Sequence, residues 1–201
     1  MVNSRCTCCG ALVRIAEYGA DQRSSVYVLD GGISPEDAVR CEAVITSSHP
    51  SVRLEWLRPD MQMFARFAES AWHSRAMYLR LLIPDLLPDD VERVLYVDSD
   101  VVVVRDLSPL WSVDFEQLAV YAVENFSHPT FATALPEAVS GIGASPETPY
   151  FNSGVLLMNL RVWREEGISE QVNAFLRDRP DLITWGDQDA LNLAIAGRWG
   201  L

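Results

Sequence analysis

The sequence is poor in basic residues. It carries 16 Lys and Arg residues against 28 Asp and Glu residues, a formal net charge of −12. Nucleic-acid binding requires a concentrated basic face, so this balance argues against a nucleic-acid partner. It also disfavours electrostatic docking to an anionic membrane.

Segments for membrane insertion or export are also lacking. No uninterrupted apolar stretch approaches the length of a membrane span, so we expect no transmembrane segment. The first residues, MVNSRCTCCG, lack the basic region and apolar core of a signal peptide. We therefore expect a cytoplasmic protein, for which a peripheral position at the membrane remains compatible.

Cysteine is scarce, with three residues in one cluster and one further along: Cys6, Cys8, Cys9 and Cys41. A structural zinc site usually pairs two short Cys/His units, but here the only later ligands are Cys41 and His49, at no recognisable spacing. We therefore expect reduced, unpaired thiols.

The 201 residues are ordinary for one globular domain, with 49% hydrophobic and 22% charged residues. No internal repeat or low-complexity tract interrupts them. Strand-like runs alternate with helical patterns, which predicts an α/β fold. The expected strands are residues 26–30, 52–58, 93–97, 118–125 and 150–160, with a further extended run at 101–104.

Helices are expected between these strands. One ends near Gly19, and another begins at Ser34 with Pro35 in its first position and Asp37 three residues after the cap. Residues 74–83 form a third, ended by Pro84, and further helices lie around 172–179 and from residue 187. Residues 127–149 are too long for a simple connection and predict a functional loop.

The strongest chemical signal is RVLYVDSDVVVV. In an extended chain residues i and i+2 point the same way, so Asp98 and Asp100 can present both carboxylates to one ion. Carboxylates suit Mg²⁺ or Mn²⁺, and such an ion would let an acidic chain bind a nucleoside diphosphate. The alternative is a polar turn between two strands, since Asp and Ser are common turn residues.

Two later motifs carry further candidates. In YFNSGVLLMNL, Asn152 offers a donor and an acceptor and Gly154 permits close approach of a ligand, although NSG also fits a strand-entry turn. In WGDQDALNLA, Asp187 is either a helix N-cap or a carboxylate that accepts sugar hydroxyls beside Gln188. Arg80 is either a diphosphate contact or, more simply, a surface cation.

Together these motifs resemble a known family. SRAMYLRLLIPDLLPDDVERVLYVDSDVVVVRDLSPLW, YFNSGVLLMNLRVW and DQDALNLA, in this order and spacing, are similar to the retaining glycosyltransferases of family 8. That family includes bacterial lipopolysaccharide galactosyl- and glucosyltransferases and glycogenin. VYVLDGGIS looks like its second-strand segment, so the likeness covers residues 26–201, preceded by an atypical leader and partial helix at 1–25.

The resemblance implies a GT-A-like fold, a mixed sheet flanked by helices. It implies a hexosyltransferase that moves galactose or glucose from a UDP-sugar to a saccharide or glycolipid acceptor, as in lipopolysaccharide biosynthesis. By motif position, Asp98 and Asp100 look like ligands of Mn²⁺ or Mg²⁺, and Asp187 and Gln188 like the catalytic pair that grips the sugar. The remaining donor-binding residues would be Arg80, Asp98, Ser99, Asn125, Asn152, Ser153 and Gly154. Asn125 stands where an acidic residue is often found.

Two departures from the family pattern leave alternatives open. The family opens with a strand and a D-x-N-Y-like turn, which MVNSRCTCCGALV lacks, and its late metal-ligating histidine would lie beyond Leu201. We therefore expect a fold incomplete at both ends, and an inactive or truncated member that keeps only the fold or a binding role is the alternative to an active enzyme. A sugar nucleotidylyltransferase is disfavoured because its Gly-rich basic N-terminal loop is absent.

Overall fold

The computed structural model describes residues 4–18, 25–65, 67 and 75–201, and of residues 4–10 it describes the backbone only. The chain divides into two compact units. The first unit comprises Met1–Asp60 and Val97–Asp114, and the second comprises Met61–Tyr96 and Phe115–Leu201. The expectation of a single domain over residues 1–201 stays a prediction.

The helices, 3-10 helices (η) and strands follow one another in this order: α1 Ser4–Tyr18, β1 Ser25–Leu29, α2 Pro35–Ser48, β2 Arg53–Leu57, η1 Met61–Phe64, η2 Arg75–Leu82, α3 Ile83–Leu86, β3 Arg93–Val97, η3 Ser108–Ser112, β4 Val120–Glu124, α4 Phe131–Ala134, α5 Pro136–Ile142, β5 Phe151–Asn159, α6 Leu160–Glu166, α7 Ile168–Asp178, η4 Pro180–Leu182, α8 Asp187–Ile195 and β6 Trp199–Gly200. The strands expected near residues 26–30, 52–58, 93–97, 118–125 and 150–160 are confirmed. Helix α6 was not predicted.

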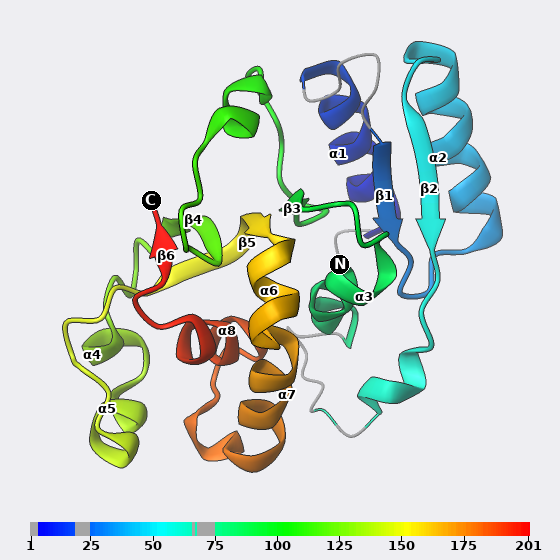
Figure 1. The fold of residues 1–201 in the computed structure, drawn as a ribbon. Helices are drawn as coiled ribbons and strands as arrows, with labels where there is room; N and C mark the ends of the chain where they lie inside the picture. Colours follow the sequence, from blue (N-terminus) through cyan, green and yellow to red (C-terminus); the bar gives the residue numbers. More distant parts are fainter. Residues whose placement is uncertain (1–3, 19–24, 66, 68–74) are drawn as a thin grey trace. The chain divides into compact units, whose positions relative to one another are not determined.

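The first unit is built on two parallel strands. β1 pairs with β2 from Ser25↔Arg53 to Leu29↔Leu57, and α1 and α2 lie beside them (Figure 1). Apolar residues of both helices and β1 form one buried cluster, made of Leu12, Ala16, Val28, Cys41 and Ile45. The predicted start of α2 is confirmed, because the Ser34 side chain accepts a hydrogen bond from the Asp37 N–H at 3.1 Å and Pro35 follows the cap.

Cys41 differs from its prediction. It is buried in the cluster between the two helices and is disulfide-bonded, so the expectation of an unpaired thiol is wrong for this residue. The side chains of the other three cysteines lie outside the described residues.

The carboxylate of Asp30 closes the end of β1. Its Oδ1 accepts the N–H groups of Gly32 and Ile33 at 2.9 and 2.6 Å, and its Oδ2 pairs with Arg58 Nε at 2.9 Å. Burial alone would raise the pKa of Asp30, but the hydrogen bonds from Arg58 and the two N–H groups outweigh it and hold that pKa below its ordinary value.

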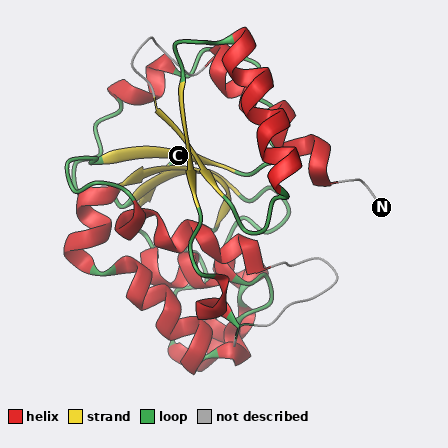
Figure 2. Cartoon of the chain, turned by 90° about the vertical axis from the view of Figure 1, so that its right-hand side faces the viewer, coloured by secondary structure: helices red, strands yellow, loops and turns green. Residues whose placement is uncertain are grey.

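The second unit contains a mixed four-stranded sheet, as predicted, in the order β3-β5-β4-β6. β4 runs antiparallel to β5 and parallel to β6. Helices α6, α7 and α8 pack together beside β5 (Figure 1), and in Figure 2 the helices of this unit gather beside its strands. The core includes Leu156, Met158, Leu160 and Trp163, each at most 1% exposed.

Arg164 of α6 holds the connection that leads into β3. Its guanidinium donates hydrogen bonds to five backbone carbonyls, at 2.9 to 3.2 Å, namely those of Pro84, Leu87, Pro88, Asp89 and Val91. One side chain therefore satisfies acceptors that this connection would otherwise leave to solvent. This fixes the chain on its way into the sheet.

The helix expected over residues 74–83 is a 3-10 helix in its described part. η2 ends at Leu82, and Pro84 lies in the first turn of α3 instead of ending a helix. The prediction of a stop at Pro84 was wrong because proline, which lacks an N–H, also fits the first turn of a new helix.

Two other segments differ from their predictions. Residues 127–149 contain the short helices α4 and α5, whose Phe131, Leu135 and Ala138 are buried in a hydrophobic cluster with Tyr150. They form part of the core, so the expected loop is partly helical, and its functional role stays a prediction. Residues 101–104, expected as an extended run, belong to no described helix or strand; Val103 is buried while Val102 and Val104 are exposed.

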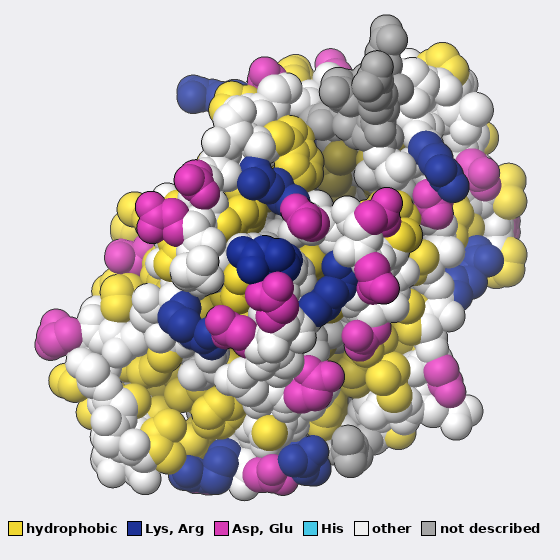
Figure 3. Space-filling model, viewed as in Figure 1, with side chains coloured by type: hydrophobic (Ala, Val, Ile, Leu, Met, Phe, Trp, Pro, Cys, Tyr) yellow, Lys and Arg dark blue, Asp and Glu magenta, His cyan; other side chains and the backbone are white. Residues whose placement is uncertain are grey.

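The surface shown in Figure 3 carries charges of both signs, and basic side chains are intermixed with acidic ones. Exposed ion pairs within one element include Arg40–Glu36 at 2.7 Å and Arg161–Glu165 at 3.0 Å. Pairs of this kind add little stability.

In the part of the chain that the structure describes, no helix is long and apolar enough to cross a bilayer.

Candidate functional site

A buried ion pair joins two of the predicted residues. Arg80 Nε of η2 lies 2.8 Å from Asp187 Oδ2 at the start of α8, and the side chains are 5% and 1% exposed. Arg80 also donates from Nε to the Met77 carbonyl at 3.1 Å and from Nη1 to the Ser153 carbonyl. Its guanidinium lies over the Tyr96 ring, 4.5 Å from the centroid. The simpler reading of Arg80 as a surface cation was wrong.

Asp187 is not the N-cap of its helix. Gly186 occupies the cap position, and Asp187 and Asp189 both lie in the first turn, where the helix dipole favours negative charge. Gly186 has φ +61°, and a Cβ there would lie 2.4 Å from Met77 Cε. A glycine at this position therefore sets both the turn and the close approach that place Asp187 beside Arg80.

Gln188 connects α8 to β5. Its Oε1 accepts hydrogen bonds from the Ser153 N–H at 3.0 Å and the Ser153 hydroxyl at 3.4 Å. Its Nε2 donates to the Tyr150 hydroxyl at 3.1 Å. Asn192, one turn later, bonds both the N–H and the carbonyl of Phe151, at 2.9 and 3.0 Å. The DQD segment is thus fixed to the NSG segment by side-chain hydrogen bonds.

The NSG residues lie inside β5, after its first residue, where pairing with β4 is irregular. Val123 pairs with Asn152 but the preceding Ala122 pairs with Leu156, so Ser153 and Gly154 fall in a bulge. Asn152 is exposed and its Oδ1 accepts the Gly154 N–H at 2.9 Å, while Ser153 is buried. Bulges of this kind often re-aim side chains next to active sites.

Asn125 holds the turn after β4. Its Oδ1 accepts the N–H groups of Ser127 and His128, both at 3.1 Å, and its own N–H donates to the Tyr150 carbonyl at 2.9 Å. The side chain is therefore engaged in local turn geometry. A donor-binding role for Asn125 stays a prediction.

Asp98, Ser99 and Asp100 form the turn that follows β3. The Asp98 carbonyl accepts the Val101 N–H at 3.1 Å, Asp98 is half-buried, and Ser99 and Asp100 are exposed. They belong to the first unit, whereas Arg80, Ser153, Asp187 and Gln188 are brought together in the second. Among the described residues no group of three or more metal-ligating side chains occurs, so the metal site stays a prediction.

Sequence reasoning missed two members of the site, Tyr150 and Asp189, both fully buried. The Tyr150 hydroxyl donates to Asp189 Oδ1 at 2.5 Å, and Asp189 Oδ2 accepts the N–H groups of Thr184 and Trp185, both at 2.6 Å. Their sequence signal was adjacency, since Tyr150 precedes FNSG and Asp189 is the second acid of DQD.

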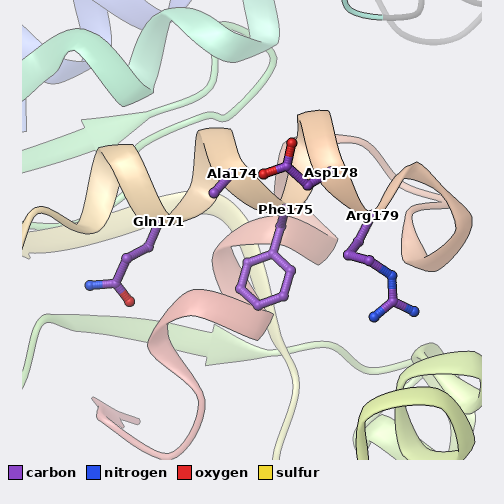
Figure 4. Close-up of a pocket in the computed structure, with 5 residues that line it drawn as sticks. All are labelled: Gln171, Ala174, Phe175, Asp178 and Arg179. Atoms are coloured by element: carbon purple, nitrogen blue, oxygen red, sulfur yellow. The ribbon is translucent and has the colours of Figure 1, made fainter.

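A shallow pocket elsewhere in the second unit contains none of these residues. It is lined from α7 and its C-terminal end by Gln171, Ala174, Phe175, Asp178 and Arg179 (Figure 4). Asp178 pairs with Arg177, and Arg179 pairs with Asp181. The pocket therefore presents one aromatic ring between groups already engaged in surface ion pairs.

The sequence motifs that supply Arg80, Ser153, Asp187 and Gln188 also occur in a known protein family. The profile of glycosyl transferase family 8 matches residues 6–200, nearly the whole chain. The chain belongs to glycosyl transferase family 8. The resemblance seen in the sequence motifs starts at residue 26, whereas the family match starts upstream of it, at residue 6.

Two relatives illustrate this membership. The family 8 chain is 33% identical over 182 residues to General stress protein A of Bacillus subtilis, covering 89% of this chain and 60% of that protein. It is 32% identical over 132 residues to the lipopolysaccharide 1,3-galactosyltransferase of Salmonella typhimurium, covering 61% and 36% respectively. The chain thus spans less than two thirds of the length of these relatives.

A solved structure agrees in fold. The galactosyltransferase LgtC, determined with donor and acceptor sugar analogs, superposes with a TM-score of 0.80 at 28% identity, covering 98% of this chain and 68% of LgtC. The predicted α/β, GT-A-like fold is therefore confirmed.

Proposed function

We propose that this family 8 chain is a retaining hexosyltransferase that moves galactose or glucose from a UDP-sugar to a saccharide or glycolipid acceptor. The observation that carries the proposal is the buried Arg80–Asp187 pair, bound through Ser153 to Gln188, in a chain that matches the family over residues 6–200. The relatives lend support, because one is named a lipopolysaccharide galactosyltransferase and another was solved with donor and acceptor sugar analogs.

The energetics of the pair support a functional role. Burying an arginine and an aspartate costs several kcal/mol in desolvation, roughly as much as their attraction returns, and apolar residues often stabilise such a position better. Charged groups held in this way occur most often at functional sites.

The residues at the end of β3 fit a divalent ion bound together with a diphosphate. Mg²⁺ and Mn²⁺ are commonly held by one or two carboxylates, with substrate phosphates and water completing the shell. Asp98 and Asp100 supply two carboxylates two positions apart, one half-buried and one exposed. When bound, such an ion would supply positive charge that stabilises the UDP leaving group.

Side chains of the second unit would stabilise the other charges that develop during sugar transfer. The fixed guanidinium of Arg80 would oppose the negative charge that builds on the diphosphate. The buried Asp187 carboxylate would favour positive charge at the anomeric carbon, with Gln188 beside it. An amide is a poor nucleophile, so retention would follow from attack by the acceptor on the face that UDP leaves.

Location is part of the proposal. We propose a cytoplasmic enzyme with peripheral membrane contact through a glycolipid acceptor. The disulfide at Cys41 counts against this placement, because disulfides persist mainly in oxidising compartments. Fractionation of cells that express the tagged chain tests it.

Titration calorimetry of UDP into the purified chain, with and without Mn²⁺, tests the function. The double variant Asp98→Ala/Asp100→Ala removes the proposed ligands, and Asp89→Ala/Asp90→Ala removes an exposed acidic pair nearby in sequence as the control. Manganese-dependent binding that only the first variant abolishes supports the proposal. A folded wild-type chain that binds no UDP would contradict it and favour an inactive member of the family.

A further inference from the structure

The hydroxyl of Tyr150 lies between two members of the DQD segment. It is 2.5 Å from Asp189 Oδ1 and 3.1 Å from Gln188 Nε2. Tyr150 is held in the core by its ring, which meets Phe131 edge-on with centroids 6.4 Å apart. Its backbone is fixed as well, since its N–H donates to the Pro129 carbonyl and its carbonyl accepts from Asn125.

The protons in this chain of hydrogen bonds can be assigned by elimination. Burial, and then the negative charge of Asp189, raise the pKa of Tyr150, so the hydroxyl keeps its proton. An ionised carboxylate accepts only, so that single proton points to Asp189. The hydroxyl then offers Gln188 lone pairs alone, and Gln188 must present its NH₂ group to it.

The oxygen of the Gln188 amide faces a group that can only donate a hydrogen bond. Gln188 Oε1 faces the Ser153 N–H at 3.0 Å, a backbone donor that cannot accept. A flipped amide would therefore lose both bonds at once. Nε2 carries two protons, and one of them is bonded to the Tyr150 hydroxyl. The direction of the second N–H bond of this partly buried amide is therefore fixed as well.

We propose that Tyr150 and Asp189 are positioning residues that fix the orientation of the Gln188 amide toward the donor sugar. This inference rests on the proposed transferase function and extends it. Neither residue touches the substrate in this account. Both are fully buried, and both carboxylate oxygens of Asp189 accept hydrogen bonds from protein groups.

Asp189 also fixes the segment that precedes Asp187. Its Oδ2 accepts the N–H groups of Thr184 and Trp185, both at 2.6 Å, immediately before Gly186. One carboxylate thus sets the turn that delivers Asp187 and, through Tyr150, the orientation of Gln188. Positioned polar groups of this kind lower the reorganisation needed in the transition state.

The first test needs no activity. In ¹⁵N–¹H spectra, the Gln188 side-chain NH₂ resonances are identified as the pair missing from Gln188→Glu. In Tyr150→Phe their hydrogen exchange should become about tenfold faster, because a buried hydrogen bond is lost. Asp189→Asn, which keeps the tyrosine, should shift the same resonances. Tyr27→Phe, a hydroxyl removal on β1, is the control. Unchanged exchange in folded Tyr150→Phe would overturn the inference.

The second test separates positioning from a general structural role. In Tyr150→Phe, kcat for release of UDP from the donor should fall about tenfold to a hundredfold. Binding of UDP alone, which lacks the sugar, should stay within about twofold. Adding Tyr150→Phe to Gln188→Ala should then slow the enzyme no further, because the tyrosine acts through the glutamine. If the fold-losses in kcat of the two single variants multiply in the double variant, Tyr150 has a merely structural role and the inference is overturned.

These outcomes are distinct from failure of the transferase function. A wild-type chain that neither binds UDP nor releases it from a donor would refute the proposed function, whereas the exchange measurement would still report whether Tyr150 fixes the amide.

Discussion

At the scale of single residues, a buried arginine and its carboxylate have to be considered together. Arg80 and Asp187 are both almost fully buried and lie 2.8 Å apart. Removing either partner leaves the other charge desolvated, which costs more than the pair itself contributes. The two single variants should therefore behave very differently from the double variant.

We predict that Arg80→Met lowers the free energy of unfolding by about 3–5 kcal/mol, because it leaves the Asp187 carboxylate uncompensated. Arg80→Met/Asp187→Asn, which removes both charges, should recover a substantial part of that loss. Urea unfolding of the wild type, Arg80→Met, Asp187→Asn and the double variant measures the coupling. If the two single losses simply add, the charges do not depend on each other and the reading of the pair is wrong.

Asp30 gives a prediction about pH. Its folded pKa is lowered below the ordinary value of an aspartate. Its hydrogen bonds therefore contribute stability that is present above the unfolded pKa and is lost as pH falls through the folded pKa. Asp30→Asn should cost about 1–3 kcal/mol near neutral pH and flatten the fall in stability below about pH 4. Exposed Glu42→Gln on α2 is the control. A variant with the same acid-side slope as the wild type would contradict the prediction.

At the scale of elements, the start of α8 depends on one glycine. Gly186→Ala would combine a left-handed φ of +61° with a Cβ 2.4 Å from Met77 Cε, whereas Gly197, at φ +73°, has nothing within 4 Å of its Cβ position. Both alanine variants should cost about 1–3 kcal/mol for the backbone, with the larger loss at Gly186. Thermal unfolding measures the difference. Equal losses would mean that Met77 swings away freely and does not fix this turn.

The elements that could be predicted are those whose sequence pattern is local. The strands near residues 93–97 and 150–160 are short apolar runs, and the start of α2 is written in Ser34, Pro35 and Asp37. The helices inside 127–149 were missed because their burial depends on distant partners such as Leu182 and Leu193, which a local pattern does not contain.

The candidate site was predictable in its residue types more than in its contacts. The DQD and NSG motifs pointed to Asp187, Gln188 and Ser153. The structure joins Gln188 to Ser153 by hydrogen bonds and Asp187 to Arg80 by an ion pair. The burial of Arg80 was missed because a charged residue on a helical pattern reads as surface. Asp189 and Tyr150 were missed because their roles exist only where α8 meets β5.

At the scale of the whole molecule, family membership and fold rest on nearly the entire chain, residues 6–200. The chain nevertheless spans only 60% of General stress protein A, so its activity has to be measured on this chain itself. The predicted metal ligands Asp98 and Asp100 fall in the first unit and the Arg80–Asp187–Gln188 group in the second.

The most direct test of the central claim is release of UDP from UDP-galactose and UDP-glucose by the purified chain, in Mn²⁺ and in a chelator. We predict release from one of these donors that requires the ion and falls about a hundredfold or more in Asp187→Asn. Release at the chelator background from both donors, by a folded chain that binds UDP, would contradict the claim that this family 8 chain is a hexosyltransferase.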